Sequence, residues 1–298
     1  MGWGFRMKPS ISLILPTRKR CDKAIRFVES ARRAATLPAE FEVVLGIDSD
    51  DHESQALHFE DVRYTTVIAP RRSMGAINTE CAQKSNGDII MLVNDDSVVR
   101  TEGWDESLRA LHAQFADGVY LGYVNDLFKG QKLCTFPVIS RTAFELLNPA
   151  FPESYQGAFI DYHLLDVFKR LQAVGHDRLV YLNDVVFEHL HFRSGKSGMD
   201  DTYRDRKRFG DDATFFELSN LRDDQACRLL QCINPAFEIP STKRNAKLLW
   251  PRSLKSMVQA FAGRFLRDSN LPLRWRVFLF RWFLFRWLYA RYFAQEGS

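Results

Sequence analysis

The stretch of sequence that decides the fold is Asp88-Ile89-Ile90-Met91-Leu92-Val93-Asn94-Asp95-Asp96. Its run of consecutive apolar residues is typical of a strand buried on both faces, as in a parallel sheet. Carboxylates do not stay in an apolar interior without a partner, so this strand must end at solvent or at a cation. Ligands of open α/β sheets bind beyond the carboxyl ends of the strands, and such oxygen atoms suit Mg²⁺ or Mn²⁺. The stretch therefore indicates either a metal site at a strand end or a simple turn.

The segments before this strand alternate between strand and helix patterns. Apolar runs predict strands at 11–16, 41–47 and 64–68, and helical spacing predicts helices at 22–35 and 73–85. Because strands and helices alternate at this spacing, we predict an α/β fold with a doubly wound, mostly parallel sheet.

After Asp96 the pattern is looser, and it predicts a small second sheet together with further helices. The helices are predicted at 104–115, 141–147 and 157–173, and the strands at 119–124, 133–139, 179–182 and 185–191. Residues 193–212 are polar and contain glycine, so they predict a loop over the site.

The composition is that of an ordinary globular protein, with 46% hydrophobic and 26% charged residues. The five cysteines are scattered and include no C-x-x-C pair. This usage argues against a disulfide framework and a zinc cluster and favours a reducing compartment. The first residues lack the apolar segment of a signal peptide, so we expect a cytoplasmic protein.

Charge is distributed unevenly along the chain. Residues 241–298 contain 12 of the 41 lysines and arginines but two of the 37 acidic residues, so they carry +10 while residues 1–240 carry −6. We therefore divide the chain into a domain of residues 1–240 and a basic, aromatic-rich helical extension of residues 241–298. Such a charge split points to an interaction surface in the basic part.

Acidic groups follow two of the predicted strands. Asp48, Asp50 and Asp51 come after the second strand, and Asp95 and Asp96 come after the strand quoted above. In a doubly wound sheet these strand ends meet at one edge, where the two groups repel unless a cation lies between them. A nucleoside diphosphate with its metal would supply that cation, although the first group is also compatible with a helix N-cap.

Together these segments resemble the GT-A glycosyltransferases of the large family 2. The resemblance covers roughly residues 10–200, and the order of the motifs is more specific than any one of them. The matching pieces are Ser12-Leu13-Ile14-Leu15-Pro16-Thr17-Arg18, Val43-Val44-Leu45-Gly46-Ile47-Asp48-Ser49-Asp50-Asp51, Gly75-Ala76-Ile77-Asn78, Asn86-Gly87-Asp88-Ile89-Ile90, Leu92-Val93-Asn94-Asp95-Asp96 and Gly103-Trp104.

The resemblance implies roles for residues in these motifs. It implies a nucleotide-sugar site and a D-x-D-like element that holds Mn²⁺ or Mg²⁺ on the diphosphate through Asp96. Asn94 stands where the family often has an acid, which weakens Asn94 as a metal ligand. The residues implied to bind the nucleotide sugar are Pro16, Thr17, Arg18, Asp48, Asp50, Asn78, Asn94 and Asp95.

The resemblance also implies a catalytic base. Inverting transfer needs a carboxylate that takes the proton of the acceptor hydroxyl, and Asp161 stands in the matching place. The usual acidic partner is replaced by Ile160. An acid at the start of a helix is the structural alternative for Asp161.

Further candidates follow in the region of residues 188–197. On a strand, His189 and His191 project on one face, and either is a candidate third metal ligand; partly buried structural histidines are the alternative. Arg193 and Lys196 are candidates to clamp the diphosphate, and a solvated loop explains them equally well.

The basic extension includes residues 271–293, which contain five arginines, three tryptophans and no acid. Arginine interrupts the apolar runs too often for a membrane-spanning helix, but a helix lying in a membrane interface is compatible with this composition. Arg276, Arg281, Arg286 and Arg291 recur every five residues, a spacing that circles a helix. Packing against the same domain or a second subunit is the alternative, and nucleic-acid binding is a weaker one.

From the sequence we therefore expect a metal-dependent inverting glycosyltransferase. It would move a sugar from a nucleoside-diphosphate sugar to a hydroxyl of a glycan or lipid-linked acceptor, in surface polysaccharide assembly. We expect it in the cytoplasm, in peripheral contact with the inner face of the membrane through residues 241–298; whether it forms a homo-oligomer is left open. The alternatives are a nucleotidyltransferase and an inactive glycan- or membrane-binding relative.

Overall fold

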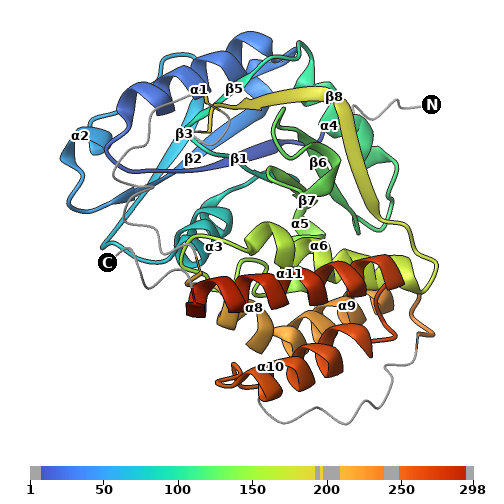
Figure 1. The fold of residues 1–298 in the computed structure, drawn as a ribbon. Coiled ribbons are helices and arrows are strands. Elements are labelled where there is room, and N and C mark those ends of the chain that lie inside the picture. The colour runs from blue at the N-terminus through green and yellow to red at the C-terminus, as the bar shows by residue number, and fades with distance from the viewer. Residues whose placement is uncertain (1–7, 192–194, 197–208, 238–247, 293–298) are drawn as a thin grey trace.

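The computed structural model describes residues 8–191, 195–196, 209–237 and 248–292. Helices cover both faces of a curled sheet, and the layer on one of these faces includes the C-terminal helices (Figure 1). Eight strands form the sheet in the order β3-β2-β1-β4-β7-β6-β8-β5.

The first half of the sheet is parallel, as the sequence predicts. β1 pairs in parallel with both β2 and β4, and β2 pairs in parallel with β3. This arrangement brings the carboxyl ends of the four strands to one edge. The strands are β1 (Ile11–Thr17), β2 (Phe41–Asp48), β3 (Arg63–Ala69) and β4 (Ile89–Leu92).

The second half of the sheet is mixed. Over the whole sheet, four of the seven strand pairs are parallel and three are antiparallel. The strands predicted at 179–182 and 185–191 form one long strand, β8, which pairs first with β6 and then with β5. The predicted small second sheet is therefore joined to the first through β8. The strands of this half are β5 (Ser97–Val99), β6 (Leu121–Asn125), β7 (Pro137–Ser140) and β8 (Leu179–His189).

Helices follow the predicted periodicity closely. The helices predicted at 22–35, 73–85, 104–115 and 141–147 agree with the structure to within two residues at each end. The helix predicted at 157–173 starts three residues later, after Phe159, whose positive φ of 71° cannot continue a helix. These helices are α1 (Cys21–Ala34), α3 (Met74–Lys84), α4 (Trp104–Ala113), α5 (Arg141–Leu147) and α6 (Ile160–Ala173).

The remaining helices are short, or lie from residue 212 onward; the predicted loop at 193–212 lies largely outside the described residues, and its last residue begins α8. They are α2 (His52–Gln55), α8 (Asp212–Glu217), α9 (Ser219–Ile233), α10 (Leu254–Phe261) and α11 (Leu273–Tyr292), with short 3₁₀ turns at Pro38–Glu40 and Gly130–Lys132 and a π-helical turn at Ala262–Leu266. Among the described residues, no helix is long and apolar enough to cross a membrane.

The core has two parts, one on each face of the sheet. Successive side chains of a strand point to opposite faces, so Leu13 and Leu15 of β1 join the cluster under α1 and α4, while Ile14 joins the other cluster. That second cluster continues without interruption into Phe283 and Trp287 of α11. The C-terminal helices thus share a hydrophobic core with the sheet, and the division at residue 240 stays a prediction.

Candidate functional site

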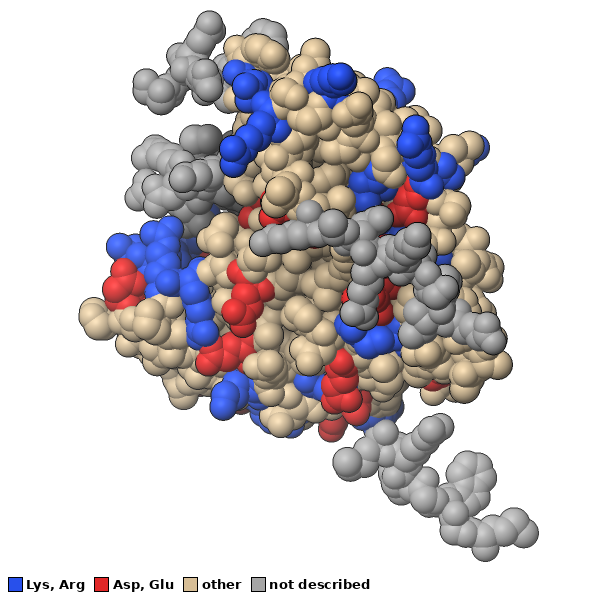
Figure 2. Space-filling view, turned by 90° about the horizontal axis from the view of Figure 1, so that it is seen from below, with Lys and Arg blue, Asp and Glu red and all other residues tan. Residues whose placement is uncertain are grey.

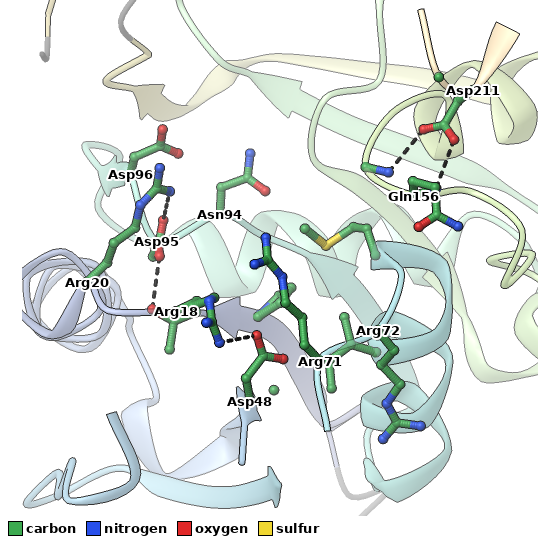
Figure 3. Close-up of a pocket in the computed structure, with 17 residues that line it drawn as sticks. Arg18, Arg20, Asp48, Arg71, Arg72, Asn94, Asp95, Asp96, Gln156 and Asp211 are labelled. Carbon is green, nitrogen blue, oxygen red and sulfur yellow. Dashed lines mark hydrogen bonds and ion pairs between the residues drawn. The ribbon is translucent and has the colours of Figure 1, made fainter. Parts of the chain in front are cut away.

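A cavity of about 670 Å³ opens at the carboxyl ends of β1, β2 and β4 (Figure 3). This volume is in the range of small-molecule sites, and the position is where open α/β sheets bind ligands. Seven residues predicted from the sequence line it: Pro16, Thr17, Arg18, Asp48, Asn94, Asp95 and Asp96.

The first acidic group is neutralised by Arg18. The Arg18 Nη1 atom lies 2.7 Å from Asp48 Oδ2 and 2.5 Å from Asp50 Oδ1, and Nη2 donates to Asp50 Oδ2 at 2.8 Å. These charge-assisted hydrogen bonds hold the pKa of the Asp50 carboxyl at about 2. Asp51 serves the backbone instead: its side chain caps α2 by accepting from the Ser54 amide. The predicted N-cap therefore applies to Asp51.

The second acidic group has its own arginine. Asp95 is 4% exposed, and its two oxygens accept from Thr17 Oγ1 at 2.9 Å and from Arg20 Nη1 at 3.0 Å. Burial raises the pKa of the Asp95 carboxyl, and the charge of Arg20 opposes this shift. Asp95 thus connects the end of β4 to the loop between β1 and α1, and each acidic group is balanced by an arginine of that loop.

Asp96 lies against a histidine. Pairing of β5 with β8 places Ser97 opposite His189, and the His189 Nε2 atom lies 3.1 Å from Asp96 Oδ1. His191 stacks on Phe128 with a ring-centroid distance of 5.4 Å. Sequence spacing leaves the two histidines equivalent, whereas the structure brings His189 to the carboxylate.

The side chains around Asp96 suit a metal ion that is held partly by the ligand better than a metal ion that protein side chains enclose completely. Among the described residues, no group of three or more His, Cys, Asp or Glu side chains is arranged to hold a metal ion. Asp96 and His189 supply two donors at a separation that one ion can bridge. Mg²⁺ commonly takes one or two protein ligands and completes its shell with substrate phosphates and water. The residues present therefore fit a Mg²⁺ or Mn²⁺ ion that is completed by a diphosphate.

Three further arginines line the cavity beside Arg18. Arg20 and Arg71 add positive charge to it, and the Arg71 side chain extends toward Asn94 in the close-up view (Figure 3). Arg72 also lines the cavity, but it forms an ion pair with Glu80 of α3. In the sequence, an arginine near the predicted end of a strand is the signal for such a contact. That signal does not distinguish these arginines from other surface arginines.

Asp211 shapes the far wall of the cavity. Its carboxylate is 4% exposed and accepts from the backbone amides of Gln156, Gly157 and Ala158 at 2.7–3.0 Å. Gln156 and Gly157 themselves line the cavity. No local pattern could reveal this contact, because Asp211 lies more than 50 residues from its partners along the chain.

The next residue connects this wall to the C-terminal helix. Asp212 is 2% exposed, and Arg286 of α11 donates to both of its oxygens at 2.6–3.0 Å. The guanidinium of Arg286 also lies over the rings of Phe159 and Trp282, at 5.3 and 5.0 Å from their centroids. Arg286 of α11 thus contacts both Asp212, which follows Asp211 of the cavity wall, and Phe159, which precedes α6.

Six of the predicted residues that the structure describes lie outside the cavity lining. Asp161 is in the first turn of α6, and its carbonyl accepts from the Cys134 thiol at 3.0 Å. Asn78 is buried on α3, Asp50 is held by Arg18, and the Lys196 Nζ atom lies 2.7 Å from Glu188. The His189 Nε2 atom lies beside Asp96 and 3.5 Å from Asn94 Nδ2, and His191 stacks on Phe128. Arg193 lies outside the described residues.

Comparison with known proteins identifies the fold. No family model matches the sequence, and no curated protein matches it. Solved structures do match: residues 1–349 of S. aureus TarS in complex with UDP-GlcNAc are 12% identical over 97% of this chain and 92% of that chain, with a TM-score of 0.52. A longer TarS structure is 13% identical over 93% of this chain and 53% of that chain, with a TM-score of 0.50.

The fold is of the GT-A type. The α/β architecture of this type that the sequence predicts is therefore confirmed, including a helical C-terminal region. At such low identity the likeness extends to the fold and not to the substrate.

Proposed function

We propose that this protein is a glycosyltransferase that binds a nucleoside-diphosphate sugar in the cavity at the ends of β1, β2 and β4. The observation that carries the proposal is the composition of the cavity wall, where acidic side chains alternate with arginines. Carboxylates suit the hydroxyls and N–H groups of a nucleoside, and arginines suit a diphosphate. The GT-A fold, a fold that glycosyltransferases use, adds support for transfer of a sugar.

The donor would lie across the cavity with its nucleoside near Asp48. In that position Asp48 and Asp50 accept hydrogen bonds from the nucleoside, and Arg18 forms ion pairs with both carboxylates. Arg71 faces the middle of the cavity, where the diphosphate would lie (Figure 3). Asn94, Asp95 and Asp96 are then near the sugar end.

Asp96 and His189 would hold a Mn²⁺ or Mg²⁺ ion on the diphosphate. When bound, such an ion neutralises the charge that develops on the departing nucleoside diphosphate. The carboxylate of Asp96 is anchored for this role, since its own backbone carbonyl accepts from the Leu190 amide at 2.8 Å and thereby ties β4 to the end of β8.

Asp161 would act as the base of a single displacement with inversion. The acceptor oxygen forms a bond to the anomeric carbon, the bond from that carbon to the diphosphate oxygen breaks, and the hydroxyl proton goes to the Asp161 carboxylate. A base on this path must lie away from the leaving group. The position of Asp161 beyond the cavity lining, four residues after Gly157, suits that requirement. The acceptor would be a glycan or a lipid-linked glycan of a surface polysaccharide.

Two substitutions test these roles with the true donor and acceptor. We expect Asp161→Asn to lower kcat at least a hundredfold while the donor Kd changes little, because a general base typically contributes 10²–10⁴-fold. Asp96→Ala should lower kcat and also weaken the dependence of donor binding on Mn²⁺. The control is Glu153→Gln, which changes an exposed residue in the segment between α5 and α6.

The two variants also separate this proposal from its rivals. A glycosyltransferase releases a nucleoside diphosphate, whereas a nucleotidyltransferase releases pyrophosphate, so product analysis distinguishes the two. Full activity in both Asp161→Asn and Asp96→Ala would rule out Asp161 as the base and Asp96 as the metal ligand.

A further inference from the structure

The outward face of α11 combines exposed apolar side chains with arginines. Leu273, Phe285 and Tyr292 are 67%, 61% and 57% exposed, while Leu279 and Phe283 on the opposite face are fully buried. At 100° per residue, the exposed residues of α11 fall within an arc of about 140°. The helix is 20 residues long, so this face extends for about 30 Å.

The structure divides the arginines of α11 between its two faces. Arg286 turns inward to Asp212, and Arg276 donates to the carbonyl of Leu266. Arg274, Arg281 and Arg291 are exposed, and α11 contains no acidic residue. The five-residue spacing therefore circles the helix as the sequence predicts, yet the solvent-facing arginines still share one side with the exposed apolar residues.

Exposed apolar residues are concentrated in this part of the molecule. Of the eleven large hydrophobic residues that are exposed in the described chain, eight lie at position 249 or later, and five of these are on α11. Seen from below, the molecule shows broad uncharged areas between groups of basic and acidic side chains (Figure 2). Exposed apolar residues gathered on one face of a helix in this way indicate an interaction site.

The geometry points to an anionic phospholipid surface as the partner of this face, with α11 lying in the plane of the membrane interface. In that position Phe278, Phe285 and Tyr292 enter the boundary between headgroups and acyl chains. Arg274 and Arg281 then lie beside lipid phosphates. Long arginine side chains reach the headgroups while their stems cover apolar surface.

Two other occupants suit this face less well. A symmetric dimer would place the same face against itself, and the exposed arginines of both copies would then meet with no acid on either α11. Nucleic acid would satisfy the arginines but would leave Leu273 and Val277 exposed to phosphate and water. A lipid interface is the partner that accommodates both kinds of side chain.

Membrane docking has a consequence for the site, and this consequence rests on the proposed function. Trp282 of α11 stacks on Tyr162 of α6 with a ring-centroid distance of 4.5 Å, and Tyr162 adjoins Asp161. A docked α11 therefore holds the first turn of α6 close to the lipid. A lipid-linked acceptor would reach Asp161 from that side.

Vesicle binding by the full chain tests the inference. Vesicles of phosphatidylcholine with and without phosphatidylglycerol are sedimented with the protein at about 0.1 M salt, where the Debye length is about 10 Å. We expect the wild-type chain to bind only the anionic vesicles. Arg274→Glu/Arg281→Glu should reduce binding at least tenfold, because each basic residue near such a surface contributes about 1 kcal/mol. Phe278→Ser/Phe285→Ser should also reduce it.

The matched control is Arg32→Glu/Arg33→Glu at the end of α1, which changes net charge by the same amount on two exposed residues. It should bind like the wild type. Equal loss in both charge-reversed variants, or no wild-type binding to anionic vesicles, would overturn the inference. So would a dimer in light scattering that Arg274→Glu/Arg281→Glu dissociates, or binding to duplex DNA without binding to vesicles.

A second measurement keeps this inference separate from the proposed function. The shift in Tm caused by a sugar nucleotide reports donor binding and should be the same in the wild type and in Arg274→Glu/Arg281→Glu. If no nucleotide produces a shift while vesicle binding follows the expected pattern, the proposed function fails and the membrane surface stands.

Discussion

At the scale of single residues, arginines replace the cation that the sequence suggests between the two acidic groups. Arg18 pairs with Asp48 and Asp50, and Arg20 pairs with Asp95. Arginines therefore offset part of the negative charge at this edge of the sheet before any ligand binds. The metal ion that we propose would lie at Asp96, where the neighbouring donor is His189.

A histidine outside the cavity makes the fold sensitive to pH. His163 is fully buried between Tyr155 and Gln225, at 3.0 Å from the phenol oxygen and 2.7 Å from the amide oxygen. Gln225 Nε2 donates to the carbonyls of Leu147 and Pro149, so its oxygen accepts from His163 Nε2 and leaves Nδ1 to accept from Tyr155. The imidazole is thus neutral, and burial lowers the pKa of His163 to about 3.

This depressed pKa gives a signed prediction. The unfolded chain takes up a proton on His163 below about pH 6.5 and the folded chain does not, so stability is complete above 6.5 and is lost as pH falls toward 3. Between pH 7.5 and 5.5 this one group should lower the free energy of unfolding by about 1.4 kcal/mol. Urea unfolding of the wild type and His163→Gln at both pH values measures the difference. Parallel pH dependence in the two proteins would show that His163 is not buried as a neutral group.

Single residues also show where sequence reasoning stops. Asp95 and Asp96 could be placed at the site because a strand pattern ends at them. Asp211 and His163 could not, because the partners of Asp211 lie 53 or more residues away and Gln225, one of the two partners of His163, lies 62 residues away. A polar side chain whose partner is distant in sequence has the same local pattern as one that faces water.

At the scale of secondary-structure elements, periodicity predicted the strands of the parallel half and most helices. β5 was missed because three residues are too few to show alternation, and its partner β8 lies far along the chain. The antiparallel position of β7 between β4 and β6 was also not predicted, since strand order depends on packing and not on local pattern. These elements are the ones that bring His189 to Asp96.

The junction of α11 with α8 gives a prediction about the site. Arg286→Leu leaves the buried carboxylate of Asp212 without its partner, which should lower the free energy of unfolding by about 3 kcal/mol. Because Asp211 next to it holds the backbone of Gln156 and Gly157, we also expect the donor Kd to rise several-fold. Arg286→Lys keeps the charge but loses the two-pronged contact, so it should show an intermediate effect.

The control for this junction is Arg281→Leu, which removes an arginine from the exposed face of the same helix. Its stability should stay within about 0.5 kcal/mol of the wild type and its donor Kd should not change. A donor Kd in Arg286→Leu equal to that of the wild type would mean that α11 supports the fold without shaping the cavity wall.

At the scale of the whole molecule, the helices of the basic extension are part of the packed fold. One face of α11 packs into the hydrophobic core on one side of the sheet. Arg286 contacts Asp212 beside the cavity wall, and the opposite face of the helix is exposed to solvent. The sequence indicated a basic, aromatic helix but left open whether it packs on its own domain. Composition could not decide this, because tryptophan and arginine serve equally well in packing and at an interface.

The central claim is that the cavity binds a nucleoside-diphosphate sugar and that the chain transfers the sugar. The most direct measurement is ³¹P NMR of the full chain with Mn²⁺-free Mg²⁺ buffer, a panel of sugar nucleotides and a glycan or lipid-linked acceptor. We expect that one donor is consumed, that free nucleoside diphosphate accumulates only when acceptor is present, and that Asp161→Asn slows the conversion at least a hundredfold. Release of pyrophosphate, or no binding and no conversion of any sugar nucleotide, would contradict it.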